Sequence, residues 1–204
     1  MGEEIDRTIE IRAGEEISGF RIIRVLPLPE IGAVACRARH LKSGAELLHL
    51  HNRDRENLFA IGFRTPPPDN TGLPHILEHA VLCGSRKYPV KDPFAALLKT
   101  SLATFLNAMT YPDRTVYPCA SMSEKDLFNL IDVYCDAVFQ PRLRPEHFAQ
   151  EGHHLEFLRP ADITSPLRIK GVVYNEMKGV YSDLDGLIGR RITAALFPDN
   201  AYGR

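Results

Sequence analysis

The chain has 204 residues, of which 44% are hydrophobic and 25% are charged, and its formal net charge is −1. This length and apolar content can bury one sizeable core with a small appendage. The basic residues are scattered, which argues against nucleic acid as a partner, and no apolar run approaches the roughly 20 residues that span a membrane. The acidic first residues resemble neither a secretory signal nor a transit peptide. We therefore expect a cytoplasmic protein of bacterial type or the mature form of an organelle matrix protein.

The first third of the chain predicts an antiparallel sheet. Residues 1–18 are polar and are expected to form a peripheral N-terminal segment. Short β-prone runs separated by prolines and glycines follow at 20–28, 31–39, 45–51 and 58–63. In the third run, leucines alternate with His49 and His51, so we expect the leucine side to face the core and both histidines to face solvent.

The rest of the chain predicts mainly helices. A proline run at 66–68 ends the sheet. Helices are predicted after this run and at 92–102, 145–158, 167–181 and 184–196, and a strand pair at 105–111 and 115–121. Ser121 and Glu124 fit a capping box that opens another helix. Strands followed by helices, without regular βαβ alternation, predict the α+β class: an antiparallel sheet layered with helices in one domain over residues 1–204.

The pentapeptide His75-Ile76-Leu77-Glu78-His79 is the most informative motif. On a helix, His75 and His79 lie on one face, and Glu78 lies three residues from His75 on the same side. Zinc needs convergent neutral nitrogens, and a carboxylate beside the open coordination position can accept a proton from water. The H-x-x-E-H order is typical of the inverzincins. The motif therefore predicts a metallopeptidase-type site.

The flanking residues favour a helix at this motif. Asn70-Thr71-Gly72 offers N-cap side chains, Pro74 suits the first turn, and Gly84 is a natural stop. The simpler alternative is a half-buried helix whose two histidines and glutamate are satisfied by hydrogen bonds.

A catalytic zinc usually takes a third protein ligand, and spacing alone does not choose it. The downstream candidates are Glu146, Glu151, Glu156, Glu176 and the pair His153-His154. Cys83 lies four residues after His79, but a buried thiol is the simpler interpretation. The four cysteines, at positions 36, 83, 119 and 135, form no C-x-x-C motif, which favours free thiols in a reducing compartment.

Five segments together carry a family resemblance. They are FRTPP at 63–67, GLPHILEH at 72–79, GSRKYP at 84–89, NAMTYPD at 107–113 and VYNEMKG at 173–179. With these segments in this order, the stretch from about residue 57 to 204 resembles the pitrilysin or insulinase family of zinc peptidases. It looks especially like the presequence protease branch, whose members degrade targeting peptides. The domain type implied is that of pitrilysin and the mitochondrial processing peptidase.

The resemblance implies a complete site. It implies His75, His79 and Glu176 as the ligands of one zinc ion, Zn2+, with Glu78 as the general base. It also implies that Asn107 and Ala108 lie on a sheet edge that pairs with the substrate backbone. A sheet edge forms hydrogen bonds with the main chain of the substrate rather than with its side chains, so it selects extended, unfolded peptides such as presequences.

Length is the main departure from the family, whose presequence proteases are far larger and close two halves into a chamber. The expected partners are therefore unfolded peptides and a C-terminal half or second chain, and exposed packing surface predicts self-association. Two other functions are weighed. One is a non-catalytic peptide-binding or partner subunit, which the intact motif disfavours. The other is a metal lyase of related fold that takes a cysteine, Cys119 or Cys135, as third ligand.

Overall fold

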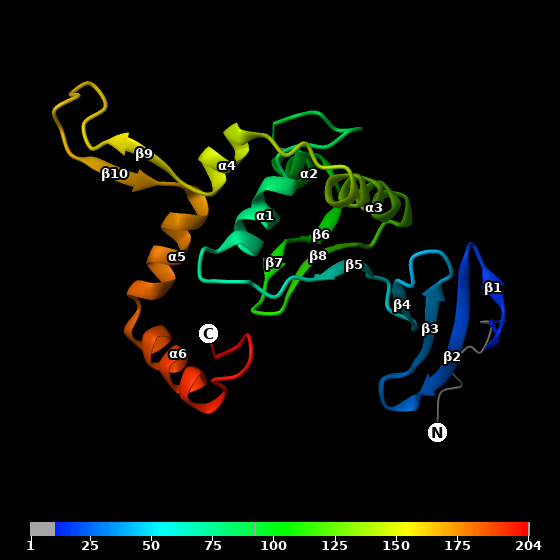
Figure 1. The fold of residues 1–204 in the computed structure, drawn as a ribbon. Helices are drawn as coiled ribbons and strands as arrows, with labels where there is room; N and C mark the ends of the chain where they lie inside the picture. Colours follow the sequence, from blue (N-terminus) through cyan, green and yellow to red (C-terminus); the bar gives the residue numbers. More distant parts are fainter. Residues whose placement is uncertain (1–10, 92, 204) are drawn as a thin grey trace. The chain divides into compact units, whose positions relative to one another are not determined.

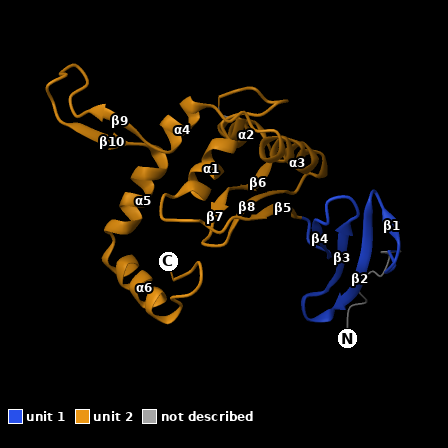
Figure 2. Ribbon diagram, viewed as in Figure 1, with its two compact units in different colours: residues 1–55 blue, residues 56–204 orange. Residues whose placement is uncertain are grey.

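The structure is a computed structural model that describes residues 11–91 and 93–203 (Figure 1). Its antiparallel sheets and helices confirm the predicted α+β class. The chain divides into two compact units, residues 1–55 and 56–204 (Figure 2). The single domain over residues 1–204 stays a prediction, and most of the predicted peripheral segment lies outside the described residues. No helix in the described ranges is long and apolar enough to cross a membrane.

The first unit is a four-stranded antiparallel sheet in the order β1-β2-β3-β4. Its elements are β1 (Glu16–Ile17), β2 (Phe20–Leu28), the 3-10 helix η1 (Pro29–Ile31), β3 (Ala33–His40) and β4 (Glu46–His51). The three predicted strands are confirmed, although β3 begins two residues late because η1 fills the connection. Ile22, Cys36 and Ala38 form its small core.

The leucines of β4 lie on the opposite face of the sheet from the one expected. His49 is opposite Cys36 in the ladder, and opposite residues share a face of the sheet. The histidines therefore lie on the face that carries the small core. Leu48 and Leu50 lie on the other face and are 66% and 47% exposed. The predicted core side is wrong, because the small residues Cys36 and Ala38 of β3 determine it. His49 is nevertheless exposed, as expected, and His51 is half-buried.

The second unit contains a sheet in the order β5-β8-β6, formed by β5 (Asn57–Arg64), β8 (Arg114–Ser121) and β6 (Ala103–Leu106). The two-residue strand β7 (Met109–Thr110) also pairs with β8. All pairs are antiparallel, and β5 and β8 pair over their full lengths. The strands predicted at 58–63 and 115–121 are confirmed, whereas the one predicted at 105–111 is divided into β6, which begins two residues earlier, and β7. The free side of β6 and β7 forms an edge of this sheet.

Helices α1 (Leu73–Val81), α2 (Pro93–Thr100) and α3 (Glu124–Phe139) pack against this sheet. The core cluster combines residues from α1, β8 and α3, namely Val81, Tyr117, Cys119, Leu130 and Tyr134. Burying one large apolar side chain of this kind stabilises the fold by about 1.5–3 kcal/mol. Tyr134 also donates a hydrogen bond to the Asn107 carbonyl, 3.2 Å away. The cluster therefore fixes α1 and the segment after β6 on the same sheet.

The start of α3 differs from the predicted capping box. Ser123 is the N-cap, and its side chain accepts a hydrogen bond from the Asp126 N–H. Ser121 is the last residue of β8, and its hydroxyl lies 3.0 Å from a carboxylate oxygen of Asp126. The box predicted at Ser121 and Glu124 is therefore wrong by two residues, because a second serine lies closer to the helix.

The chain continues with α4 (Pro145–Glu151), a hairpin of β9 (His154–Phe157) and β10 (Leu167–Lys170), α5 (Val172–Ser182) and α6 (Leu184–Leu196). Helix α6 is confirmed. The helices predicted over 145–158 and 167–181 are wrong where the hairpin lies, and each is shortened. A Cβ on Gly171 would lie 2.0 Å from the carbonyl oxygen of Gly152. These two glycines let the hairpin close between α4 and α5.

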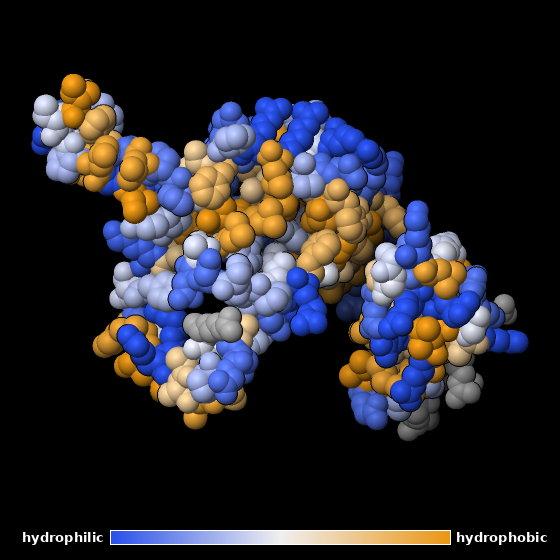
Figure 3. Space-filling model, viewed as in Figure 1, coloured by the Kyte–Doolittle hydropathy of each residue, from blue (hydrophilic) through white to orange (hydrophobic). Residues whose placement is uncertain are grey.

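The hairpin presents an apolar face. Leu155 pairs with Ile169 and Phe157 with Leu167, so these four side chains share one side. Leu155 and Leu167 are 64% and 58% exposed, and apolar residues are visible on the hairpin in Figure 3. A two-stranded hairpin alone is marginally stable in water. Self-association through such surfaces stays a prediction.

Candidate metal centre

Helix α1 places the two histidines of the motif on one face. It begins after Gly72, which adopts the left-handed conformation with φ 76°, and it has Pro74 in its first turn as predicted. The N-cap lies within the predicted tripeptide Asn70-Thr71-Gly72, at Gly72, but the expectation of a side-chain cap is wrong, because no side chain caps the helix. The imidazole rings of His75 and His79 lie edge to face with centroids 5.0 Å apart.

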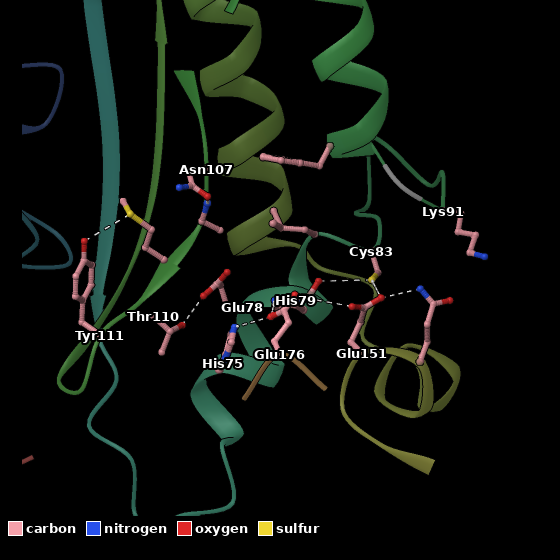
Figure 4. A pocket seen from close by; sticks show the side chains of 15 residues that line it. His75, Glu78, His79, Cys83, Lys91, Asn107, Thr110, Tyr111, Glu151 and Glu176 are labelled. Atoms are coloured by element: carbon pink, nitrogen blue, oxygen red, sulfur yellow. Dashed lines mark hydrogen bonds and ion pairs between the residues drawn. The ribbon is translucent and has the colours of Figure 1, made fainter. Parts of the chain in front are cut away.

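Helix α5 brings Glu176 to these histidines. Its Oε2 lies 3.6 Å from Nε2 of His75 and 3.5 Å from Nε2 of His79. Ligand atoms of the three residues all lie within 4.8 Å of one another, and Figure 4 shows them converging. Tetrahedral zinc with bonds of 2.0–2.2 Å separates its ligand atoms by about 3.4 Å. Two neutral nitrogens and a carboxylate at these distances therefore fit a zinc ion.

The other candidate ligands lie elsewhere or have other partners. Across residues 11–91 and 93–203, His75, His79 and Glu176 form the one group of three possible ligands close enough for a metal. Glu156 forms ion pairs with Arg168 and Lys170 of the hairpin. All four cysteines are free thiols, as predicted, and none belongs to the group.

Glu151, a candidate for the third metal ligand in the sequence, instead contacts one of the two histidines in the structure. It is 8% exposed, and its Oε2 lies 3.1 Å from Nδ1 of His79. Gln150 donates to its other oxygen at 2.7 Å. A hydrogen bond from Nδ1–H to a carboxylate fixes the tautomer and leaves the Nε2 lone pair for a metal. Only the fold brings the two residues, 72 apart in sequence, together, so no local pattern indicates this contact.

Glu78 is buried beside the histidines. Its residue exposure is 5%, and its Oε2 accepts a hydrogen bond from the Thr110 hydroxyl at 2.6 Å. Burial of the His75 ring lowers its pKa, and the neighbouring His79 lowers it further, while Glu78 and Glu176 oppose the shift. A lowered pKa favours the neutral imidazole, which is the form that binds metals.

These groups line a cleft of about 690 Å³. Its walls include the motif residues, Leu82 directly after α1, Phe94 of α2, and Asn107, Ala108, Met109 and Tyr111 from the segment that follows β6. The Asn107 side-chain oxygen accepts a hydrogen bond from the Ala108 N–H at 2.9 Å. The structure thus brings both predicted substrate residues to the cleft that contains the His-His-Glu group.

The chain is similar to known peptidases over most of its length. The family described as Insulinase (Peptidase family M16) matches residues 58–160. Mus musculus "Presequence protease, mitochondrial" is 47% identical over 197 residues, covering 97% of this chain and 19% of that protein. Arabidopsis thaliana "Presequence protease 1, chloroplastic/mitochondrial" is 53% identical over 187 residues, covering 91% and 17%. Clostridium perfringens "Protein HypA" is 52% identical over 187 residues, covering 91% and 19%.

A solved structure shares the fold. The crystal structure of pitrilysin matches with a TM-score of 0.60 and 22% sequence identity, covering 91% of this chain and 18% of that one. At this identity the likeness shows the fold alone. The chain spans about a fifth of the length of the curated relatives reported above.

Proposed function

The chain belongs to the insulinase family of peptidases, family M16, and from this premise we propose that it carries the zinc site of an endopeptidase that hydrolyses short unstructured peptides. The observation that carries the proposal is the convergence of His75, His79 and Glu176 at zinc-like separations. A buried carboxylate, Glu78, lies in the same cleft. Relatives named presequence proteases support targeting presequences as the substrate class.

In this proposal three residues bind the metal and a fourth transfers the proton. His75, His79 and Glu176 would hold one zinc ion. Zinc, when bound, supplies a Lewis acid that makes water more acidic and polarises a peptide carbonyl. Glu78 accepts the proton of the attacking water and delivers it to the leaving amine. Burial keeps this carboxylate close to the reacting groups and away from bulk water.

The edge formed by β6 and β7 would bind the substrate. A peptide in extended conformation can pair with a free strand edge through its main chain, which tolerates many side-chain sequences. Asn107 and Ala108 lie where this edge meets the cleft. Folded proteins cannot offer such a strand, so the proposed substrates are unfolded peptides.

We extend the proposal to the larger protein that the relatives indicate. Residues 1–204 would form an N-terminal catalytic domain, and the rest of a longer polypeptide, or a second chain, would close the cleft over the substrate. Bacterial cytoplasm or the matrix of an organelle is the proposed compartment, in keeping with relatives named mitochondrial or chloroplastic.

Hydrolysis of an unstructured peptide tests the function directly. We expect the purified chain to cleave a 20-residue unstructured peptide, and we expect a zinc chelator to lower the rate at least about tenfold, because the ligands alone cannot activate water. Added zinc should restore the rate. Mass spectrometry of the products checks this, with a small folded protein as the control that should stay intact. A chain that binds one zinc and peptide yet cleaves nothing would instead be the non-catalytic subunit.

Glu151 provides a prediction about the metal alone. Replacing Glu151 with alanine should lower zinc affinity about 10–100-fold, because the His79 ring loses the partner that fixes its tautomer. Competition with a chromophoric chelator measures this change. Glu146→Ala, an exposed glutamate on the same helix, is the matched control and should bind zinc like the wild type. Equal affinities for the two variants would remove Glu151 from the site.

A further inference from the structure

Thr110 makes a contact that the proposed chemistry does not yet use. Its hydroxyl donates a 2.6 Å hydrogen bond to Oε2 of Glu78 (Figure 4). Glu78 is 5% exposed, so bulk solvent offers its carboxylate few hydrogen bonds. In the part of the chain that the structure describes, Thr110 is the hydrogen-bond donor found for this carboxylate. A charge-assisted bond of this length is about twice as strong as a neutral one.

Two further threonines lie behind Thr110. The Thr110 and Thr115 hydroxyl oxygens are 3.3 Å apart, and those of Thr115 and Thr65 are 2.7 Å apart. Because Thr110 donates to Glu78, its oxygen is left to accept from Thr115, which in turn accepts from Thr65. Thr115 is 2% exposed, so its hydroxyl depends on these partners. The three hydroxyls thus form a row that ends at the carboxylate.

The sheet fixes this row. Thr110 is the last residue of β7 and pairs with Thr115 of β8, while Thr65 directly follows β5 and its N–H donates to the Asp113 carbonyl. The strands of a sheet are rigid compared with loops, so the position of the Thr110 hydroxyl is set by the backbone ladder. Glu78 comes from α1, which packs on β7. The hydrogen bond therefore joins the carboxylate on the helix to the sheet.

We propose that Thr110 is a positioning residue that holds Oε2 of Glu78 and leaves Oε1 free to exchange a proton with the reacting groups. The inference rests on the proposed peptidase function for its kinetic consequence, but the placement of the carboxylate can be measured without it. A carboxylate with one oxygen held by the sheet has less rotational freedom. A displacement of about 1 Å in such a group can cost about 100-fold in rate.

Two substitutions separate the hydroxyl from the bulk of the side chain. Thr110→Val keeps the size and removes the donor, and Thr110→Ser keeps the donor. We expect Thr110→Val to lower kcat about 10–100-fold with KM within about twofold, and Thr110→Ser to stay within about threefold of the wild type. Zinc content should be equal in all three proteins. Thr193→Val, which removes a hydroxyl on α6, is the matched control and should keep the wild-type rate.

Crystal structures of the wild type and of both variants give the second readout. We expect the Glu78 carboxylate to occupy one orientation in the wild type and in Thr110→Ser, and to rotate or split into two conformers in Thr110→Val. An unmoved carboxylate in Thr110→Val, or equal kcat values for Thr110→Val and Thr110→Ser, would overturn the inference. A wild-type protein that cleaves no peptide would count against the proposed function, while the three structures would still decide the role of Thr110.

Discussion

Replacing Glu78 with glutamine should lower the rate of peptide hydrolysis at least about 1000-fold and leave zinc binding within about twofold of the wild type. The amide has nearly the same shape as the carboxylate, and its oxygen can still accept the hydrogen bond from Thr110. It cannot take a proton from water at neutral pH, so the step assigned to Glu78 is lost. Neither imidazole changes, so the affinity of the ligand set stays the same.

Three measurements on this variant separate the possible roles of Glu78. Cleavage of the peptide gives the rate, elemental mass spectrometry gives the metal per chain, and thermal unfolding reports the fold. Glu146→Gln is the matched control, since it makes the same chemical change on an exposed helix surface. Cleavage at the wild-type rate would exclude Glu78 as the base. Loss of zinc together with activity would mean that the buried carboxylate supports the ligands rather than the proton transfer.

The local part of the site could be predicted from sequence because helix geometry is local. Residues four apart on a helix always share a face, so His75 and His79 required no knowledge of the fold. Glu176 could not be identified in this way, because it is far from the motif in sequence. The residues alone left four glutamates and the pair His153-His154 open as the third ligand, and only the family resemblance selects Glu176. In the structure, the close crossing of Gly152 and Gly171 brings α5 back to α1, which no periodicity in the sequence indicates.

The wrong predictions of secondary structure and of strand burial have a common physical cause. Residues 154–157 and 167–170 alternate apolar and polar side chains over only four positions each. Runs this short are not distinguishable from the longer helical patterns beside them, and the pairing of Leu155 with Ile169 is a contact between the two runs. The predicted core side of β4 is wrong for a similar reason. Which face of a strand is buried depends on its neighbour in the sheet, here the small residues of β3.

Removing the Glu176 carboxylate should lower zinc affinity at least about 100-fold while leaving the metal-free protein folded, because a three-ligand site loses one of its bonds. The side chain of Glu176 is 49% exposed, so Glu176→Ala creates no buried cavity. In the absence of zinc, the free energy of unfolding should change by no more than about 0.5 kcal/mol. Titration against a chromophoric chelator measures the affinity.

Stability measured with and without zinc links this affinity to the fold. A ligand that binds only the folded state stabilises it according to its concentration relative to the dissociation constant, so a 100-fold weaker site loses about 2.7 kcal/mol of that stabilisation when zinc is in large excess. The wild type and Glu176→Ala should therefore unfold alike without zinc and differ when it is added. Glu146→Ala should follow the wild type in both conditions.

The cysteine variants decide between Glu176 and a thiolate as the third metal ligand. Cys119→Ala and Cys135→Ala should keep the zinc affinity of the wild type, since neither thiol lies in the His-His-Glu group. Burial raises the pKa of the Cys119 thiol to about 12, and the thiol form is a poor metal ligand. If instead Glu176→Ala kept its zinc and a cysteine variant lost it, the third ligand would be a thiolate. The site would then match the metal lyase alternative, and the peptidase assignment of Glu176 would be wrong.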